Sequence, residues 1–336
     1  MKAHLKSLRS RWNFYRQCYL DSKRFLQSIS PEHLDEAAAV ARIESDIVRQ
    51  YHVIEKGLCM PDFRPKFGKD VVTGLVKSIR ELAAHPCAAS CNPGQLAAAR
   101  ATLREYHDRH LALGIDISDI LPASSHELFE GAMPAVGGTR PFTPVDTNDA
   151  QAFQNVVFSR ASVRDMNPDR VPDRTLIQQA VETALRSPSV CNRQTARVHV
   201  FTGDAAQRTL ALQSGNRGFG HKIPMVIIVT SDLRFFTGTV ERYQGWIDGG
   251  MFSMLLLLAL HAIGLGAVSL NWSVNNAKDL ALRKTAAIPE YERIMMLIGC
   301  GYPNEQCRIP VSTRRNPEEI ISWNQASENH VEHPHP

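Results

Sequence analysis

The sequence lacks the cysteine pattern of a disulfide-stabilised secreted protein. Its seven cysteines are an odd number, and they are scattered over 336 residues without a regular spacing. The first residues are basic and contain no apolar core segment, so they match neither a secretory signal nor a clear transit peptide. Both absences favour reduced thiols, and we therefore expect a cytoplasmic protein.

A strong charge of either sign is also absent. The chain has 38 basic and 34 acidic residues, which gives a formal net charge of +4. No basic run is interleaved with aromatic residues, so we expect no nucleic-acid binding. His85, Cys87 and Cys91 lie close together, but one Cys-x-x-x-Cys pair without a second pair is poor evidence for zinc, and no metal site is predicted.

Motifs of several large enzyme classes are missing. The sequence has no Gly-Lys-Ser or Gly-Lys-Thr of a phosphate-binding loop and no Gly-x-Ser-x-Gly elbow of a hydrolase. The glycine-rich loop at 215–220 precedes a predicted strand, whereas a Rossmann fingerprint follows one. The sequence therefore gives no support to these three classes.

Long apolar runs are limited to one stretch, from Gly249 to Leu270. About 20 apolar residues suffice to span a bilayer, but Gly264 and Gly266 end the helical pattern after about 15 residues. We therefore predict a buried helix followed by a strand, with no membrane span. A helix that is apolar on all sides needs cover on all sides, which favours dimerisation.

The chain divides into two parts by its patterns. Residues 5–121 show apolar positions at helical spacing, with helices expected near 70–84 and 95–113 and no alternating strand. Prolines and glycines then mark a linker. We predict a helical region at 1–121, a linker at 122–150, a cofactor-binding domain at 151–325 and a flexible tail at 326–336.

The second part has an α/β pattern. After Pro172 and Asp173, apolar residues recur at helical spacing and predict a helix with one apolar face. Strands are expected at 197–201, 225–230, 267–271 and 294–300. Helices that alternate with four strands predict a mixed sheet with helical cover.

Three polar motifs in this part suit a phosphorylated, planar cofactor with an amide edge. Arg160, Ser162 and Arg164 offer two guanidinium groups and a hydroxyl, which bind phosphate through charge-assisted hydrogen bonds. Asn192 and Gln194 offer donors and acceptors to the edge of a ring. Together with the later Arg314-Arg315 pair, they describe the requirements of flavin mononucleotide (FMN).

The order of these motifs resembles that of the nitroreductase superfamily over residues 155–325. The resemblance rests on Arg-x-Ser-x-Arg, then Pro-Ser-x-x-Asn-x-Gln, the apolar helix after Asp248, and the closing strand with its arginine pair. It implies an α+β fold, with a three-layer α/β/α domain around a mixed, mainly antiparallel sheet. Thr195 and Ala196 depart from the family, which often has a proline and an aromatic residue there, so the wall beside the cofactor is expected to differ.

The resemblance also implies the chemistry. Such enzymes are homodimers that take hydride from NADH or NADPH onto FMN and then reduce a small acceptor, such as a nitroaromatic or a quinone, by a ping-pong mechanism. No catalytic side chain is nominated, because the flavin carries the chemistry. The implied cofactor-binding residues are Arg160, Ala161, Ser162, Arg164, Ser189, Asn192, Gln194, Gly266, Ser269, Leu270, Arg314 and Arg315.

Alternatives remain open at this stage. Arg164 could simply pair with Asp165 or Asp169, and Asn192 could simply cap a turn. For the whole protein, the alternatives are a non-catalytic flavin-binding module whose helical region recruits a partner, or family chemistry such as reductive dehalogenation or flavin breakdown. The sequence does not choose between NADH and NADPH, and it assigns no role to the first 150 residues.

Overall fold

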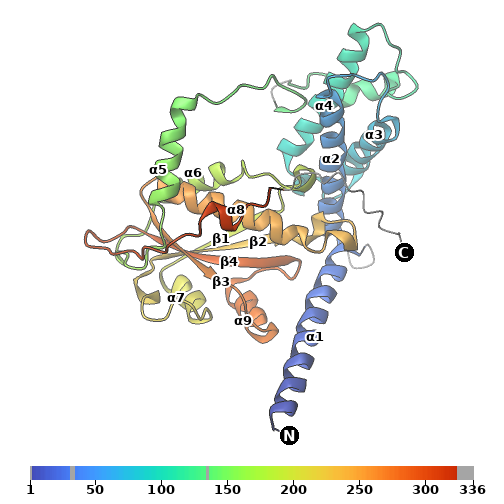
Figure 1. Cartoon of the computed structure of the whole chain (residues 1–336). Coiled ribbons are helices and arrows are strands. Elements are labelled where there is room, and N and C mark those ends of the chain that lie inside the picture. The colour runs from blue at the N-terminus through green and yellow to red at the C-terminus, as the bar shows by residue number, and fades with distance from the viewer. Residues whose placement is uncertain (1, 31–34, 134–135, 324–336) are drawn as a thin grey trace, which may run out of the picture.

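The structure is a computed structural model that describes residues 2–30, 35–133 and 136–323. A helical part is followed by a sheet with helices on both faces (Figure 1). The longer helices are α1 (Lys2–Ile29), α2 (Glu36–Leu58), α3 (Lys69–Ala84), α4 (Pro93–Ala112), α5 (Ala150–Ser159), α6 (Arg174–Ala184), α7 (Gly203–Ala211), α8 (Gln244–Ala262) and α9 (Asn276–Ala286). The helices expected near 70–84 and 95–113 are confirmed as α3 and α4.

The four expected strands are present and form one sheet. They are β1 (Ala196–Thr202), β2 (Met225–Asp232), β3 (Gly266–Asn271) and β4 (Glu292–Gly301), in the order β1-β2-β4-β3. Every neighbouring pair within the sheet is antiparallel, and among the described residues parallel pairing is confined to an isolated bridge between Ser162 and Ala267. The α+β class with a mainly antiparallel sheet is confirmed, and β1 and β3 are its edge strands.

Helices cover both faces of the sheet. In Figure 1, α6 and α8 lie on one face, and α7 and α9 lie on the other. Successive side chains of a strand alternate between faces. Along β2, Ile227 and Val229 therefore pack with α6 and α8, whereas Val226 and Ile228 pack with α7 and α9. Burial on both faces explains why the β2 sequence is almost continuously apolar.

The helical region has its own apolar core, formed by α2, α3 and α4. Helix α2 also contacts the sheet domain through polar groups. The Ser45 hydroxyl donates a hydrogen bond of 2.6 Å to the carbonyl oxygen of Phe235, and the Arg42 guanidinium donates one of 2.5 Å to that of Phe236. These bonds fix α2 against the short helical turn η8 (Leu233–Phe235).

Helix α8 is the apolar helix that the sequence indicated. It begins before the apolar run, so it is longer than expected. Within the described residues, the segment Thr239–Ala262 is long and apolar enough to cross a membrane, and half of its most apolar window is buried inside the protein. Its inner face packs on the sheet, while Ile247, Met251 and Met254 form an exposed outer face.

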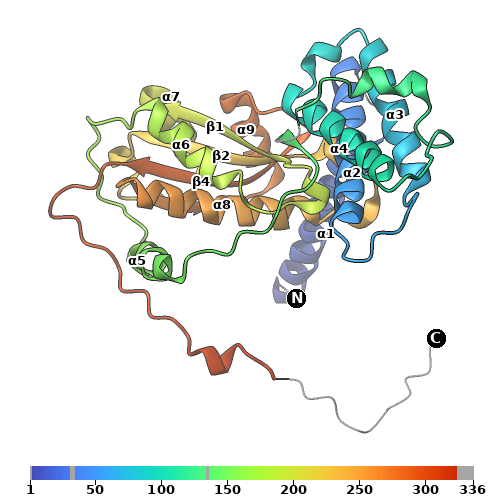
Figure 2. The same cartoon turned by 90° about the horizontal axis from the view of Figure 1, so that it is seen from above.

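Two long connections frame the domain. The first runs from the helical region to α5 as extended chain (Figure 1), and Glu55 and Glu105 accept hydrogen bonds from the backbone N–H groups of Gly138 and Thr139. The second continues from β4 and leaves the body of the protein as an extended segment (Figure 2). The predicted tail at 326–336 lies outside the described residues.

Candidate functional site

The first group of predicted residues lies beside the start of β3. The Val163 N–H donates a hydrogen bond of 3.0 Å to the carbonyl oxygen of Ala267, and Ser162 forms a parallel bridge with the same residue. A Cβ at Gly266 would lie 2.8 Å from the Val163 side chain, so a larger residue would push the two segments apart. The fold thus brings the Arg160–Arg164 segment into contact with the Gly266–Leu270 strand.

The two arginines of this group have no acidic partner among the described residues. Arg164 does not pair with Asp165, because that carboxylate accepts hydrogen bonds from Lys222 at 2.7 Å and Asn304 at 2.9 Å. These bonds hold the pKa of Asp165 below its usual value. Arg160 lies near His261, and burial together with this positive charge lowers the pKa of that histidine. The group is therefore positive and suited to an anion.

A cavity of about 270 Å³ adjoins this group. Arg164, Ser269 and Leu270 are among its lining residues, and Ser269 is exposed whereas Leu270 is buried. Phe219 also lines the cavity, with its ring 5.8 Å from the Arg164 guanidinium carbon. The cavity thus combines a cation, a hydroxyl and an aromatic surface. We refer to Arg160–Arg164 and Gly266–Leu270 as the phosphate-side group.

The second group is the loop between α6 and β1, which we call the amide loop (Ser189–Gln194). Cys191, Asn192 and Gln194 all have positive φ angles, between 49° and 56°, which non-glycine residues adopt at an energetic cost. The Ser189 hydroxyl accepts a hydrogen bond of 3.0 Å from the Gln194 N–H. Gln194 also donates to the Asn192 side-chain oxygen at 3.2 Å, so the two amides lie next to each other.

Two helices hold the amide loop from outside. Asp248 in α8 accepts a hydrogen bond of 3.1 Å from the Val190 N–H. The Asn192 amide donates to the hydroxyl of Tyr51 at 3.4 Å, and this hydroxyl donates to Gln95 at 2.5 Å. Burial and the nearby Glu55 raise the pKa of Tyr51 to about 12, so its hydroxyl stays protonated. The helical region thus supports a loop that was predicted to bind cofactor.

Sequence reasoning did not identify Tyr51 as part of the site. Its spacing indicated only the apolar face of a helix, and 141 residues separate it from Asn192. Of the two residues that depart from the family pattern, Ala196 lines the same cavity as Gln194, whereas Thr195 lies in the core. Thr195 is fully buried, and its hydroxyl hydrogen-bonds to that of Ser231 at 2.9 Å, so the departure at this one residue is accommodated in the core.

The third predicted group, Arg314 and Arg315, lies apart from the other two. Both residues are exposed on the extended segment after β4, which Figure 2 shows leaving the domain. Arg315 pairs with Glu319 at 3.0 Å, and Arg314 donates to the carbonyl oxygen of Ser312 at 2.5 Å. In a single chain these arginines do not join the phosphate-side group.

Strand register places the first two groups at opposite corners of the sheet. The phosphate-side group adjoins Gly266, which pairs with Gly301 at the end of β4. The amide loop leads into Ala196, which pairs with Ser231, and that residue pairs with Arg293 near the start of β4. The step from Arg293 to Gly301 is about 27 Å at about 3.4 Å per residue. The Arg160–Arg164 segment and the amide loop of the same chain are therefore too far apart for one small molecule to contact both.

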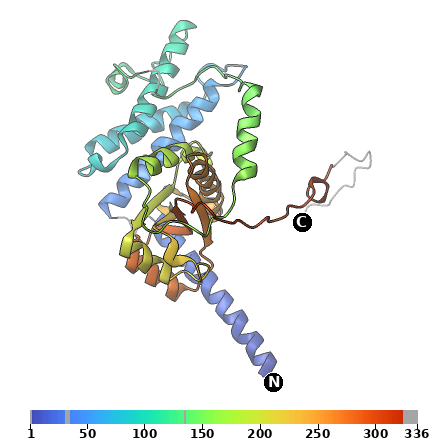
Figure 3. The ribbon, with the colours of Figure 1, turned by 90° about the vertical axis from the view of Figure 1, so that its left-hand side faces the viewer.

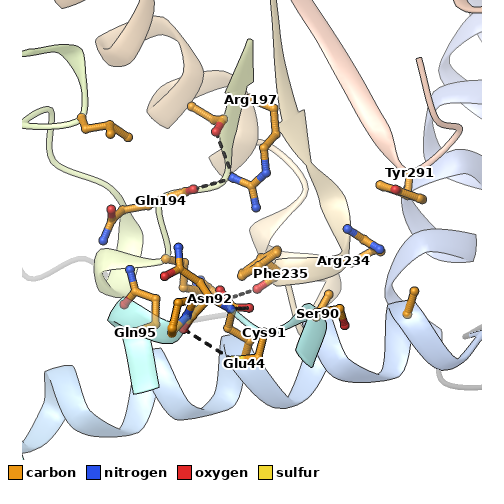
Figure 4. A pocket seen from close by; sticks show the side chains of 16 residues that line it. Glu44, Ser90, Cys91, Asn92, Gln95, Gln194, Arg197, Arg234, Phe235 and Tyr291 are labelled. Atoms are coloured by element: carbon orange, nitrogen blue, oxygen red, sulfur yellow. Dashed lines mark hydrogen bonds between the residues drawn. The ribbon is translucent and has the colours of Figure 1, made fainter. Parts of the chain in front are cut away.

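A further cavity, of about 800 Å³, lies where the helical region meets the sheet domain (Figure 4). Glu44 of α2 and Asn92 lie on one side of it, and Gln194, Arg197 and Arg234 lie on the other. Because Gln194 lines it, this cavity adjoins the amide loop and lies away from the phosphate-side group. Its polar lining comes from both parts of the chain.

The sheet half of the chain matches a known family. The family model of the nitroreductase family matches residues 157–215 and 204–302. An NADH dehydrogenase of Thermus thermophilus is 25% identical over 205 residues, which cover 51% of this chain and 95% of that protein. An iodotyrosine deiodinase of Drosophila melanogaster is 22% identical over 214 residues, which cover 54% of this chain and 74% of that protein.

Solved structures match over the same half. A nitroreductase with bound FMN from Desulfitobacterium hafniense is 21% identical, with a TM-score of 0.41, over 52% of this chain and 98% of that one. Helices α1 to α4 lie outside the family match.

The contact between Tyr51 and Asn192 can be tested by removing one oxygen atom. In Tyr51→Phe, Asn192 loses its hydrogen-bond partner on α2, which is worth about 1 kcal/mol. We expect amide hydrogens of the amide loop to exchange about fivefold faster, measured by mass spectrometry. Tyr106→Phe is the control, because its hydroxyl donates to Phe67 within the helical region. Equal exchange in the two variants would show that Tyr51 does not support the loop.

Proposed function

We propose that the protein is an FMN-dependent oxidoreductase, because residues 157–215 and 204–302 match the family model of the nitroreductase family. It takes hydride from NADH or NADPH and passes electrons to a small organic acceptor such as a nitroaromatic or a quinone. FMN supplies the redox chemistry when bound. The protein's own residues bind the cofactor, orient it and leave space for the acceptor.

The observation that carries the proposal is the pair of arginines beside β3 that have no acidic partner in the part of the chain that the structure describes. A guanidinium that no carboxylate neutralises is available to a phosphate, and the Ser162 hydroxyl adds a further donor. The glycine at 266 lets the two segments approach each other closely. Arg160 and Ser162 would hold the phosphate or the ribityl chain, and Arg164 would lie nearer the pyrimidine ring, where a cation favours the anionic reduced flavin.

A homodimer is part of the proposal. The Arg160–Arg164 segment and the amide loop lie too far apart to contact one FMN within a chain. In a dimer with two-fold symmetry, the phosphate-side group of one chain can meet the amide loop of the other, and each of two sites is then complete. The exposed apolar face of α8, formed by Ile247, Met251 and Met254, supplies a surface for this contact.

Removal of one arginine tests the cofactor assignment. Arg160→Ala should weaken FMN binding by about 1.5 to 3 kcal/mol, or roughly ten- to a hundredfold, as for a lost charged hydrogen bond. The dissociation constant is measured by the change in flavin fluorescence on binding. Arg208→Ala is the control, because Arg208 is an exposed residue of α7 outside the groups described above. Unchanged affinity in Arg160→Ala would remove this residue from the site.

The redox assignment is tested by anaerobic titration. When NADH and NADPH are added separately to the FMN-loaded protein, at least one of them should abolish the visible absorbance of the oxidised flavin. A nitroaromatic or a quinone should then restore it. Free FMN under the same conditions is the control for uncatalysed reduction. Bound flavin that stays oxidised with both donors would contradict a nicotinamide-dependent reductase and favour a non-catalytic flavin module.

The dimer is tested on the outer face of α8. Met254→Asp places a charge in the proposed contact, so we expect a monomer by sedimentation velocity and at least tenfold weaker FMN binding. Leu280→Asp is the control, since Leu280 is 44% exposed on α9 and lies outside that face. A wild-type protein that sediments as a monomer while binding FMN tightly would disprove the shared site.

A further inference from the structure

Helix α1 projects from the protein without cover over much of its length. Figures 1 and 3 show its N-terminal half extending away from both the sheet domain and the helical region. All residues from 8 to 16 are exposed. A solitary helix in water gains nothing from burial, so the composition of its faces indicates what it contacts.

One side of α1 holds the helix onto the protein. Gln17 accepts a hydrogen bond of 2.9 Å from the Asn276 N–H, and Arg24 pairs with Asp279 at 3.0 Å. Phe25 is buried beside Phe236. These contacts define the inner side of the helix, and they lie in its C-terminal half.

The opposite side carries an apolar, largely aromatic stripe. Its members recur every three, four or seven residues, so they share one face of the helix. They are between 46% and 68% exposed. The stripe consists of Leu8, Trp12, Tyr15, Tyr19 and Leu26. It extends for about 27 Å at 1.5 Å per residue and points away from the body of the protein.

Basic residues flank this stripe on both sides. Arg9, Arg16 and Lys23 recur every seven residues along one flank, and Arg11 lies on the other. None of these four forms an ion pair within the described residues. Between residues 8 and 29 the single acidic residue is Asp21, which lies 4.0 Å from Arg24. The outer surface of α1 is therefore aromatic at its centre and positive at its edges.

We propose that α1 is an interfacial helix that lays this stripe on a membrane surface containing anionic lipids. Tryptophan and tyrosine favour the boundary between headgroups and acyl chains, and flanking arginine and lysine side chains are attracted to anionic headgroups. The stripe faces away from the domain, so the helix can lie flat while the domain stays above the surface. A second copy of α1 is less suited to cover the stripe. If two stripes packed against each other, the basic flanks of the two helices would lie side by side and repel.

Vesicle co-sedimentation of the full-length protein tests this proposal. We expect it to sediment with vesicles of phosphatidylcholine and phosphatidylglycerol, to bind vesicles of phosphatidylcholine alone at least tenfold more weakly, and to dissociate as salt is raised. Trp12→Glu combined with Tyr19→Glu should reduce binding to the anionic vesicles at least tenfold. Both residues are exposed, so folding should be unaffected, which circular dichroism and flavin content would verify.

Phe14→Glu is the matched control, because Phe14 is a 64% exposed aromatic residue of the same helix outside the stripe. It should retain most of the binding. Equal loss of binding in both variants, or no binding of the wild type to anionic vesicles, would overturn the proposal. Self-association of the wild type that Trp12→Glu abolishes, without vesicle binding, would assign the stripe to a second copy instead.

Discussion

The antiparallel pairing of β4 with β2 and β3 determines where the phosphate-side group and the amide loop lie. Because Gly301 pairs with Gly266 and Arg293 pairs with Ser231, the ends of β4 carry the phosphate-side group at one corner and the amide loop at the other. No side-chain movement can close that distance within one chain. The cofactor assignment and the dimer are therefore a single hypothesis, and the apolar outer face of α8 is the surface that it requires.

The helical region supports the conformation of the amide loop in the sheet domain. The amide loop contains three residues with positive φ, a costly backbone that persists only when its surroundings hold it. Asp248 holds it from α8, as expected for a domain that folds around its own core. Tyr51 holds it from α2, so the helical region stabilises a conformation that the proposed cofactor needs. A change that loosens α2 should therefore be detected first in flavin affinity.

Much of this fold could be predicted from local patterns, because strands buried on both faces and helices with one apolar face leave clear periods in the sequence. The four strands and helices α3 and α4 were found in this way. Contacts between segments that are distant in the sequence produce no periodic pattern of residues from which they could be predicted. The hydrogen bond between Tyr51 and Asn192 and the bridge between Ser162 and Ala267 depend on how complete elements pack. Gln244, Gly245 and Asp248 interrupt the first turns of α8, so its continuous apolar run alone did not define where the helix begins.

Ion pairing distinguishes arginines with a structural role from those that can bind a ligand. The sequence alone could not make this distinction. Arg193 lies inside the Asn-x-Gln motif, yet its side chain is fully buried and pairs with Glu241, as a buried charge requires. Arg234 is likewise paired with Asp232. Arg160 and Arg164 stand in an equally arginine-rich motif but have no carboxylate partner within the described chain. A guanidinium that no carboxylate neutralises is available to a phosphate, and this difference supports the proposed assignment of FMN to the corner beside β3.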